Sequence, residues 1–258
     1  MNKKQKVLSE IYRICQKQNN FVFDNDLVKK ISKKHKFGNP FDVTKLDSTE
    51  KFAKIMLRND VFVSHIGSGK HKFIKGISKG YHDFEKINDE HIIQWKYKKS
   101  ILNEYDTSES NILSVASNQK IIHNFLYQNI VAPIKVYNAR RTKTSFEYQI
   151  DEEEVKMNNI QIEIDLTMEL NGAVTIFEGK NNFSKDFAVY QIYHPFLYFS
   201  RIKKENKLPI KKISACYILR KKIDGTSVLR LYNYTFDNEN DITSIKLLKS
   251  AEYYLIKK

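Results

Sequence analysis

The segment from 161 to 182 restricts the fold more than any other part of the chain. Its first half alternates apolar side chains with acidic or polar ones, from Ile162 to Glu169, as expected of a half-buried strand. Asn171-Gly172 follows, the pair that most strongly favours a tight hairpin turn, and an apolar run then leads to Glu178-Gly179-Lys180. The sequence therefore predicts a β-hairpin with acidic residues along one face of its first strand.

Folding this hairpin at its turn would bring Asp165 across from residues 176–178, next to Glu178. Two neighbouring carboxylates suit Mg²⁺, a hard cation that prefers oxygen ligands, and the backbone carbonyl of Gly179 is a candidate further ligand. Lys180 lies on the same face as Glu178 because side chains in a strand alternate with a period of two. There it would orient a water molecule or neutralise charge on a phosphate, so the pattern predicts a Mg²⁺ site for phosphodiester chemistry.

The Glu-x-Lys triplet alone carries little weight in a chain with 29% charged residues, and it also occurs at 154–156 and 205–207. Those two triplets belong to charged stretches. Only the triplet at 178–180 ends an apolar strand that follows an acid-bearing strand. The alternative is that Asp165 and Glu178 are ordinary edge carboxylates paired with surface lysines.

Charge is distributed unevenly along the chain, whose net charge is +14. Residues 1–80 hold 18 basic and 7 acidic residues, residues 81–200 hold 12 and 17, and residues 201–258 hold 14 and 6. A basic first third favours a polyanionic partner such as DNA, although a lysine-rich proteome would produce part of this excess without any function. Two cysteines exclude a disulfide framework. The chain shows neither a leader pattern nor a long apolar run, so we expect a cytoplasmic protein without a membrane segment.

The basic first third predicts three helices and a hairpin. Residues 3–17 carry an apolar stripe at helical spacing, and a second helix follows Asp24 as N-cap. A third helix is expected over 47–60, with Asp47 or Ser48 as cap, and residues 61–76 read as two strands joined by Gly67-Ser68-Gly69. This order is that of a winged helix, which we expect to occupy residues 1–80.

In a winged helix the third helix usually enters the major groove and the hairpin tip contacts the DNA backbone. The predicted DNA contacts are therefore four residues of the third helix and three of the tip: Ser48, Thr49, Lys51, Lys54, Lys70, His71 and Lys72. The alternative is a small domain that mediates protein contacts only.

The middle of the chain is expected to connect and support the hairpin. Residues 81–105 read as a connector, and 109–128 as one long helix beside a sheet. Glu109 at the start of that helix is either an additional carboxylate near the metal or, as we favour, a first-turn acid that complements the helix dipole. Residues 135–150 read as a hairpin with Arg140, Arg141 and Lys143 at its turn, where they would contact DNA.

Further strands are expected after residue 210, with Asp224-Gly225 as a turn. The fold predicted for the whole chain is thus mixed α/β. It combines a winged helix (1–80), a connector (81–105) and a mixed sheet flanked by helices (106–258).

These features resemble the PD-(D/E)xK nuclease superfamily, and more closely its type II restriction endonucleases with an N-terminal winged helix. The resemblance lies in residues 41–76, 163–182 and 189–202 and covers most of the chain. It implies an active site of Asp165, Glu178 and Lys180, although Ile164 stands where the superfamily's name has Pro. Gln191 resembles the Gln of a Gln-x-x-x-Tyr element of such nucleases, but His194 and Pro195 stand where a Tyr would be sought.

The resemblance implies Mg²⁺-dependent cleavage of double-stranded DNA at a short specific site, together with a DNA methyltransferase encoded nearby. Because one active site per chain must cut two strands, we also expect a homodimer. Two alternatives stay open: a winged-helix regulator without nuclease activity, and a repair or modification-dependent nuclease. The acidic run 151–154 has no role in any of these interpretations.

Overall fold

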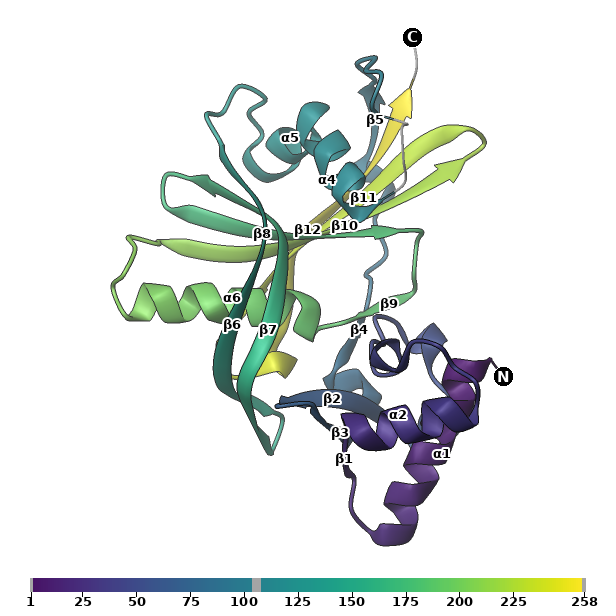
Figure 1. The fold of residues 1–258 in the computed structure, drawn as a ribbon. Helices are drawn as coiled ribbons and strands as arrows, with labels where there is room; N and C mark the ends of the chain where they lie inside the picture. The colour runs from purple at the N-terminus through teal and green to yellow at the C-terminus, as the bar shows by residue number, and fades with distance from the viewer. Residues whose placement is uncertain (1, 104–107, 257–258) are drawn as a thin grey trace.

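The computed structural model describes residues 2–103 and 108–256. It is a mixed α/β protein in which N-terminal helices accompany a large mixed sheet with flanking helices (Figure 1). The helices are α1 (Lys3–Gln18), α2 (Asn25–Lys34), α3 (Lys54–Arg58), α4 (Glu109–Asn118), α5 (Ile121–Tyr127) and α6 (Tyr190–Lys204). The strands are β1 (Val22–Asp24), β2 (Val61–Gly67), β3 (Lys70–Lys75), β4 (Tyr81–Asp83), β5 (Ile92–Lys96), β6 (Lys135–Ile150), β7 (Glu153–Leu170), β8 (Ala173–Asn181), β9 (Asp186–Ala188), β10 (Lys212–Ile223), β11 (Thr226–Phe236) and β12 (Ile245–Ile256).

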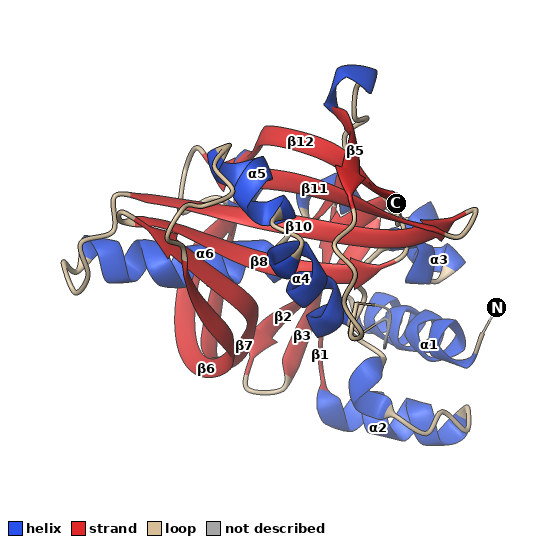
Figure 2. Cartoon of the chain, turned by 90° about the horizontal axis from the view of Figure 1, so that it is seen from above, coloured by secondary structure: helices blue, strands red, loops and turns tan. Residues whose placement is uncertain are grey.

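Among the described residues, ten strands form one sheet in the order β1-β3-β2-β7-β8-β10-β11-β12-β5, with β6 pairing on β7. β8 and β10 run parallel and most other pairs are antiparallel. Helices α4 and α5 cover one face of the central strands, and α6 covers the other (Figures 1 and 2). Each central strand is therefore buried on both faces, which explains its almost continuous apolar sequence.

The N-terminal region follows the predicted order with one difference. α1, α2 and the β2–β3 hairpin form as expected, and Asp24 caps α2 by accepting a hydrogen bond from the Leu27 amide. The predicted third helix is wrong as a single helix: it divides into a 3₁₀ turn at Thr49–Lys51 and the short α3. Phe52 and Ala53 between them are extended and buried, so packing of the Phe52 ring against Tyr81 interrupts the helix.

Two elements of the middle region also differ from prediction. The long helix over 109–128 is two helices, α4 and α5, because Lys120 between them has a left-handed backbone with φ of 60°. The hairpin over 135–150 is a single strand, β6, which pairs with β7 along nearly its whole length, and the turn lies at 151–152. Arg140, Arg141 and Lys143 consequently lie in mid-strand and not at a turn.

The segment expected to be a connector supplies two strands. β4 pairs with β9, which directly precedes α6, and β5 pairs in parallel with β12 at the far edge of the large sheet. Residues 81–83 and 92–96 therefore belong to the sheets. Among the described residues, no helix is long and apolar enough to cross a membrane.

Candidate functional site

A cleft of about 590 Å³ lies between the N-terminal region and the strands β7 and β8. Side chains from four elements of the main sheet region line it: Glu109 from α4, Asp165 from β7, Glu178 and Lys180 from β8, and Gln191 from α6. The structure thus brings together the predicted catalytic side chains Asp165, Glu178, Lys180 and Gln191, and it adds Glu109, which lies more than 50 positions earlier in the sequence.

The β7–β8 hairpin explains why Asp165 and Glu178 meet. Its turn residues Asn171 and Gly172 have φ of 53° and 85°, as the predicted tight turn requires. The ladder pairs Thr167 with Ile176 and Leu166 with Phe177, so the next position brings Asp165 beside Glu178. The Gly179 amide lies 3.5 Å from Asp165 Oδ2, at the outer limit for a hydrogen bond. The predicted register is confirmed.

Lys180 is held between two carboxylates. Its Nζ lies 2.8 Å from Glu178 Oε1 and 2.6 Å from Glu109 Oε1. Burial opposes the charged ammonium, but the charges of Glu178 and Glu109 outweigh burial and raise the pKa of Lys180. Lys180 therefore stays protonated at neutral pH and can act only as a hydrogen-bond donor and positive charge.

Glu109 begins α4, which Ser108 caps by accepting a hydrogen bond from the Asn111 amide. The position of Glu109 in the first turn of α4 agrees with the helix-dipole role predicted for it. The same carboxylate also contacts Lys180 in the cleft. The two interpretations are therefore compatible.

The pKa values of both carboxylates that could bind a metal are raised. Burial raises the pKa of Glu178 to about 8, with the Asp165 charge adding to the effect and Lys180 opposing it. Burial also raises the pKa of Asp165, again against the influence of Lys180. Two half-buried carboxylates in one cleft are costly to ionise together, and a bound cation would reduce that cost.

These oxygens suit a divalent ion with a preference for hard ligands. Asp165 and Glu178 could each supply a carboxylate ligand, and the backbone carbonyl of Gly179 could supply a third oxygen ligand. In the two described ranges no group of three or more His, Cys, Asp or Glu side chains is arranged to hold a metal. A metal here would keep water or substrate oxygens in its remaining positions, as Mg²⁺ commonly does.

Gln191 lies one residue inside α6, close to its predicted place at the helix start. Its Nε2 donates to Glu178 Oε1 over 3.0 Å, while its Oε1 accepts a hydrogen bond from the Tyr217 hydroxyl over 3.1 Å. The sequence did not reveal Tyr217, because this residue comes next to Glu178 only through the parallel pairing of β8 with β10.

Comparison with known proteins gives a family but no activity. A family model described as a domain of unknown function, DUF6997, matches residues 76–254, well over half of the chain. The chain belongs to this DUF6997 family. A second model, described as the domain of unknown function DUF6996, matches residues 4–73. No curated protein and no solved structure matches the chain.

The DUF6997 match contains every residue of the candidate site, and the DUF6996 match contains the predicted DNA-contacting residues of the N-terminal region. The structure places these latter residues in different surroundings. Lys54 and Lys70 are exposed, and Lys51 lines the cleft, where it pairs with Asp47.

The remaining N-terminal candidates face protein. Ser48 is buried and caps the 3₁₀ turn, while the amide and hydroxyl of Thr49 donate to the buried Asp186 of β9. The expectation that His71 lies on the wing surface is wrong, since His71 is fully buried and bonded to Asn25. Because β1 adds a third strand on the outer side of β3, this side chain is enclosed.

The tip of the β6–β7 hairpin accounts for the acidic run in this DUF6997 chain. Glu153 pairs with Lys72 of the β2–β3 hairpin, and Asp151 lies 2.7 Å from Lys79. The acidic tip therefore docks on the basic N-terminal region and removes Lys72 from the set of unpaired lysines.

The three predicted DNA contacts on β6 differ in whether another side chain already pairs with them. The Arg140 guanidinium lies 5.0 Å from the Tyr198 ring centre, a cation–π contact with α6. Arg141 pairs with Glu163 across β6 and β7, and Lys143 is exposed. Arg141 and Lys143 therefore remain accessible to a ligand.

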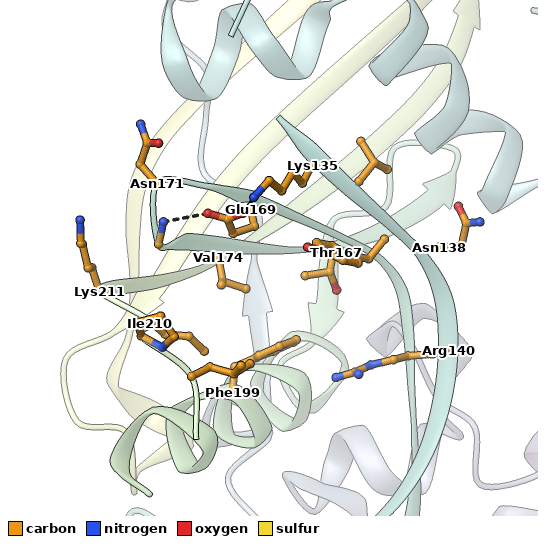
Figure 3. A pocket seen from close by; sticks show the side chains of 15 residues that line it. Lys135, Asn138, Arg140, Thr167, Glu169, Asn171, Val174, Phe199, Ile210 and Lys211 are labelled. Carbon is orange, nitrogen blue, oxygen red and sulfur yellow. Dashed lines mark hydrogen bonds and ion pairs between the residues drawn. The ribbon is translucent and has the colours of Figure 1, made fainter. Parts of the chain in front are cut away.

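A larger groove of about 1430 Å³ lies elsewhere, between β6, β7 and the loop before β10 (Figure 3). Its lining is mostly apolar and includes Val174, Phe199 and Ile210, with Lys135 and Arg140 near its edge. Two side chains with an ionisable oxygen line this groove, Tyr137 and Glu169. The Glu169 carboxylate already accepts a hydrogen bond from the Gly172 amide and pairs with Lys135. The predicted catalytic residues Asp165, Glu178 and Lys180 therefore lie in the smaller cleft and not in this groove.

Proposed function

We propose that this chain is a Mg²⁺-dependent nuclease that hydrolyses phosphodiester bonds in double-stranded DNA. The observation that carries the proposal is the convergence of Asp165, Glu178 and Lys180 in one cleft. A structural ion pair would explain Lys180 with one carboxylate. It would not explain a second, half-buried carboxylate, Asp165, whose ionised form burial disfavours.

The chain's own residues have distinct roles in this proposal. Asp165 and Glu178 hold the metal, which when bound stabilises charge on the phosphate and lowers the pKa of a bound water. Lys180, fixed by Glu178 and Glu109, donates hydrogen bonds to the attacking water or to a phosphate oxygen. Gln191 holds the Glu178 carboxylate through its amide group, which fixes the direction of its second oxygen.

The proposal extends to the architecture. We interpret the sheet region as a PD-(D/E)xK nuclease domain, because an acid-bearing strand and a Glu-x-Lys strand form its central hairpin. We interpret the N-terminal region as a winged helix, supported by the order of three helices and a hairpin, although the short α3 offers fewer side chains to a DNA groove.

Under this proposal the protein is a cytoplasmic type II restriction endonuclease. Cutting both strands would use a homodimer, and a DNA methyltransferase encoded nearby would protect the host site. The acid-rich middle of the sequence then has a chemical reason, because it carries the metal ligands.

The test is cleavage of a plasmid by the full chain. Linear products of defined length, formed with Mg²⁺ and abolished by a chelator, support a site-specific nuclease. Running methylated and unmethylated plasmid in parallel separates a restriction enzyme from a modification-dependent one. DNA binding without cleavage of either plasmid, with Mg²⁺ or Mn²⁺ present, would rule out the nuclease and favour a DNA-binding regulator.

A further inference from the structure

The wall of the cleft opposite the carboxylates comes from the N-terminal region. It contributes four charged residues, namely Asp42, Lys45, Asp47 and Lys51. This wall is firmly attached to the sheet region, because the Thr49 amide donates to Asp186 over 2.8 Å and the Ala188 amide donates to the Asp47 carbonyl over 2.9 Å. Both hydrogen bonds involve β9, which leads directly into α6 and Gln191. The wall therefore has a defined position relative to Glu178.

Three of these four charges are already neutralised. Asp42 lies 3.1 Å from Lys4, and Asp47 lies 2.5 Å from Lys51. Lys45 differs, since over residues 2–103 and 108–256 its ammonium has no acidic partner. Lys45 and His65 both line the cleft, and burial, followed by the Lys45 charge, lowers the pKa of His65.

The backbone at Lys45 is held in place while its side chain is exposed. The Lys45 carbonyl accepts a hydrogen bond from Lys4 Nζ over 2.7 Å, and its amide donates to the Asp42 carbonyl over 3.1 Å. Its neighbours Thr44 and Leu46 are buried. An ammonium on a fixed backbone, with no internal partner, is well placed to bind an anion.

We propose that Lys45 binds a phosphate of the DNA strand that lies in the cleft, so that the N-terminal region and the sheet contact the same strand. This inference rests on the proposed function and adds a substrate-binding residue to it. Asp165, Glu178 and Glu109 repel a phosphodiester, and a cation on the facing wall offsets that repulsion. The cleft volume lies within the range of about 300–1,000 Å³ typical of small-molecule sites, which suits a short stretch of one strand.

The test is the salt dependence of DNA binding by the full chain, measured by fluorescence anisotropy with Ca²⁺ in place of Mg²⁺ to prevent cleavage. Each phosphate contact that is lost reduces the slope of log K against log salt by about 1. Lys45→Gln should bind about tenfold more weakly at low salt with a slope smaller by about 1, and Lys45→Arg should restore both. Lys96→Gln, an exposed lysine on the distant β5, is the matched control.

An unchanged slope and affinity for Lys45→Gln would overturn the inference, as would an equal loss for Lys96→Gln. Plasmid cleavage by the unaltered chain, scored separately, tells the two proposals apart. If the chain cuts DNA and Lys45→Gln keeps the full slope, only the Lys45 inference fails. If the chain binds DNA with the expected Lys45 effect but never cuts, only the nuclease proposal fails, and a chain that binds no DNA contradicts both.

Discussion

Tyr217 lies directly beside Glu178 across the parallel β8–β10 pair, and the Gln191 amide bridges the two side chains. The Tyr217 hydroxyl donates to Gln191 Oε1, which fixes the amide so that Nε2 faces the carboxylate. Without that hydroxyl, either end of the amide could face Glu178. Tyr217 is therefore a positioning residue for the candidate metal ligand.

Tyr217→Phe removes this hydroxyl and little else. We expect the cleavage rate constant kcat to fall about tenfold with little change in KM, because one hydrogen bond of about 1.4 kcal/mol no longer orders the site. Gln191→Glu should lower it further by placing another negative charge against Glu178. The control is Tyr253→Phe, which loses a comparable bond to Asn124 on the opposite face of the sheet. Equal losses in both Phe variants would refute the positioning role.

Glu109→Gln tests the second carboxylate on Lys180. With Glu109 neutral, the ammonium is drawn more strongly to Glu178 and competes with the cation there. We expect the Mg²⁺ concentration for half-maximal cleavage to rise several-fold, whereas Asp26→Asn, a first-turn acid of α2, should leave it unchanged. If both variants lose only thermal stability to a similar degree, Glu109 serves the helix dipole alone.

The raised pKa of Glu178 makes stability depend on pH. Its ordinary value is 4.5 and its folded value is about 8, so between these the folded chain holds a proton that the unfolded chain releases. This contribution favours folding below pH 4.5 and is lost as the pH rises towards 8, by about 1.4 kcal/mol per pH unit at most.

Mg²⁺ must take the place of that proton. Its addition should therefore raise the midpoint of thermal unfolding more at about pH 8.5 than at about pH 6. Glu178→Gln should remove both the pH dependence in this interval and most of the Mg²⁺ effect. A Mg²⁺ effect that is the same at both pH values, or that survives in Glu178→Gln, would mean that the ion binds elsewhere.

Thr49→Val tests the contact between the two regions. The Thr49 hydroxyl and amide satisfy the buried Asp186 carboxylate, and the substitution leaves one of its oxygens without a donor. The free energy of unfolding in urea should fall by about 1–3 kcal/mol. DNA affinity measured well below the unfolding transition should stay the same, because Thr49 faces β9; a specific loss of affinity would restore Thr49 as a DNA contact.

The candidate site was predictable because its signals are local. Strand alternation and the Asn171-Gly172 turn determine the register of β7 and β8, and this register alone brings Asp165 to Glu178. Gln191 was predictable for a similar reason, since it lies in the first turn of the helix that follows the same hairpin ten residues later. Lys45 and Tyr217 were not, because their places depend on the packing of α1 and on a parallel strand pair.

Errors in the predicted fold arose where tertiary packing overrides local pattern. The periodicity over 47–60 is helical, but burial of Phe52 requires an extended backbone there. The alternation over 135–150 was interpreted as a hairpin with its turn at Arg140, Arg141 and Lys143, whereas β6 continues through these residues as one strand paired with β7. The acidic run 151–154 had no visible purpose, since its partners Lys72 and Lys79 lie more than 70 residues earlier.

The central claim is that Asp165 and Glu178 hold a metal for DNA hydrolysis, and a matched pair of substitutions on β7 tests it most directly. Asp165→Asn should abolish Mg²⁺-dependent plasmid cleavage while DNA binding in Ca²⁺ stays within about threefold. Glu169→Gln changes an acid of the same strand whose partners are Lys135 and the turn amide of Gly172, so it should cut normally. Cleavage by Asp165→Asn at the rate of the unaltered chain would contradict the account.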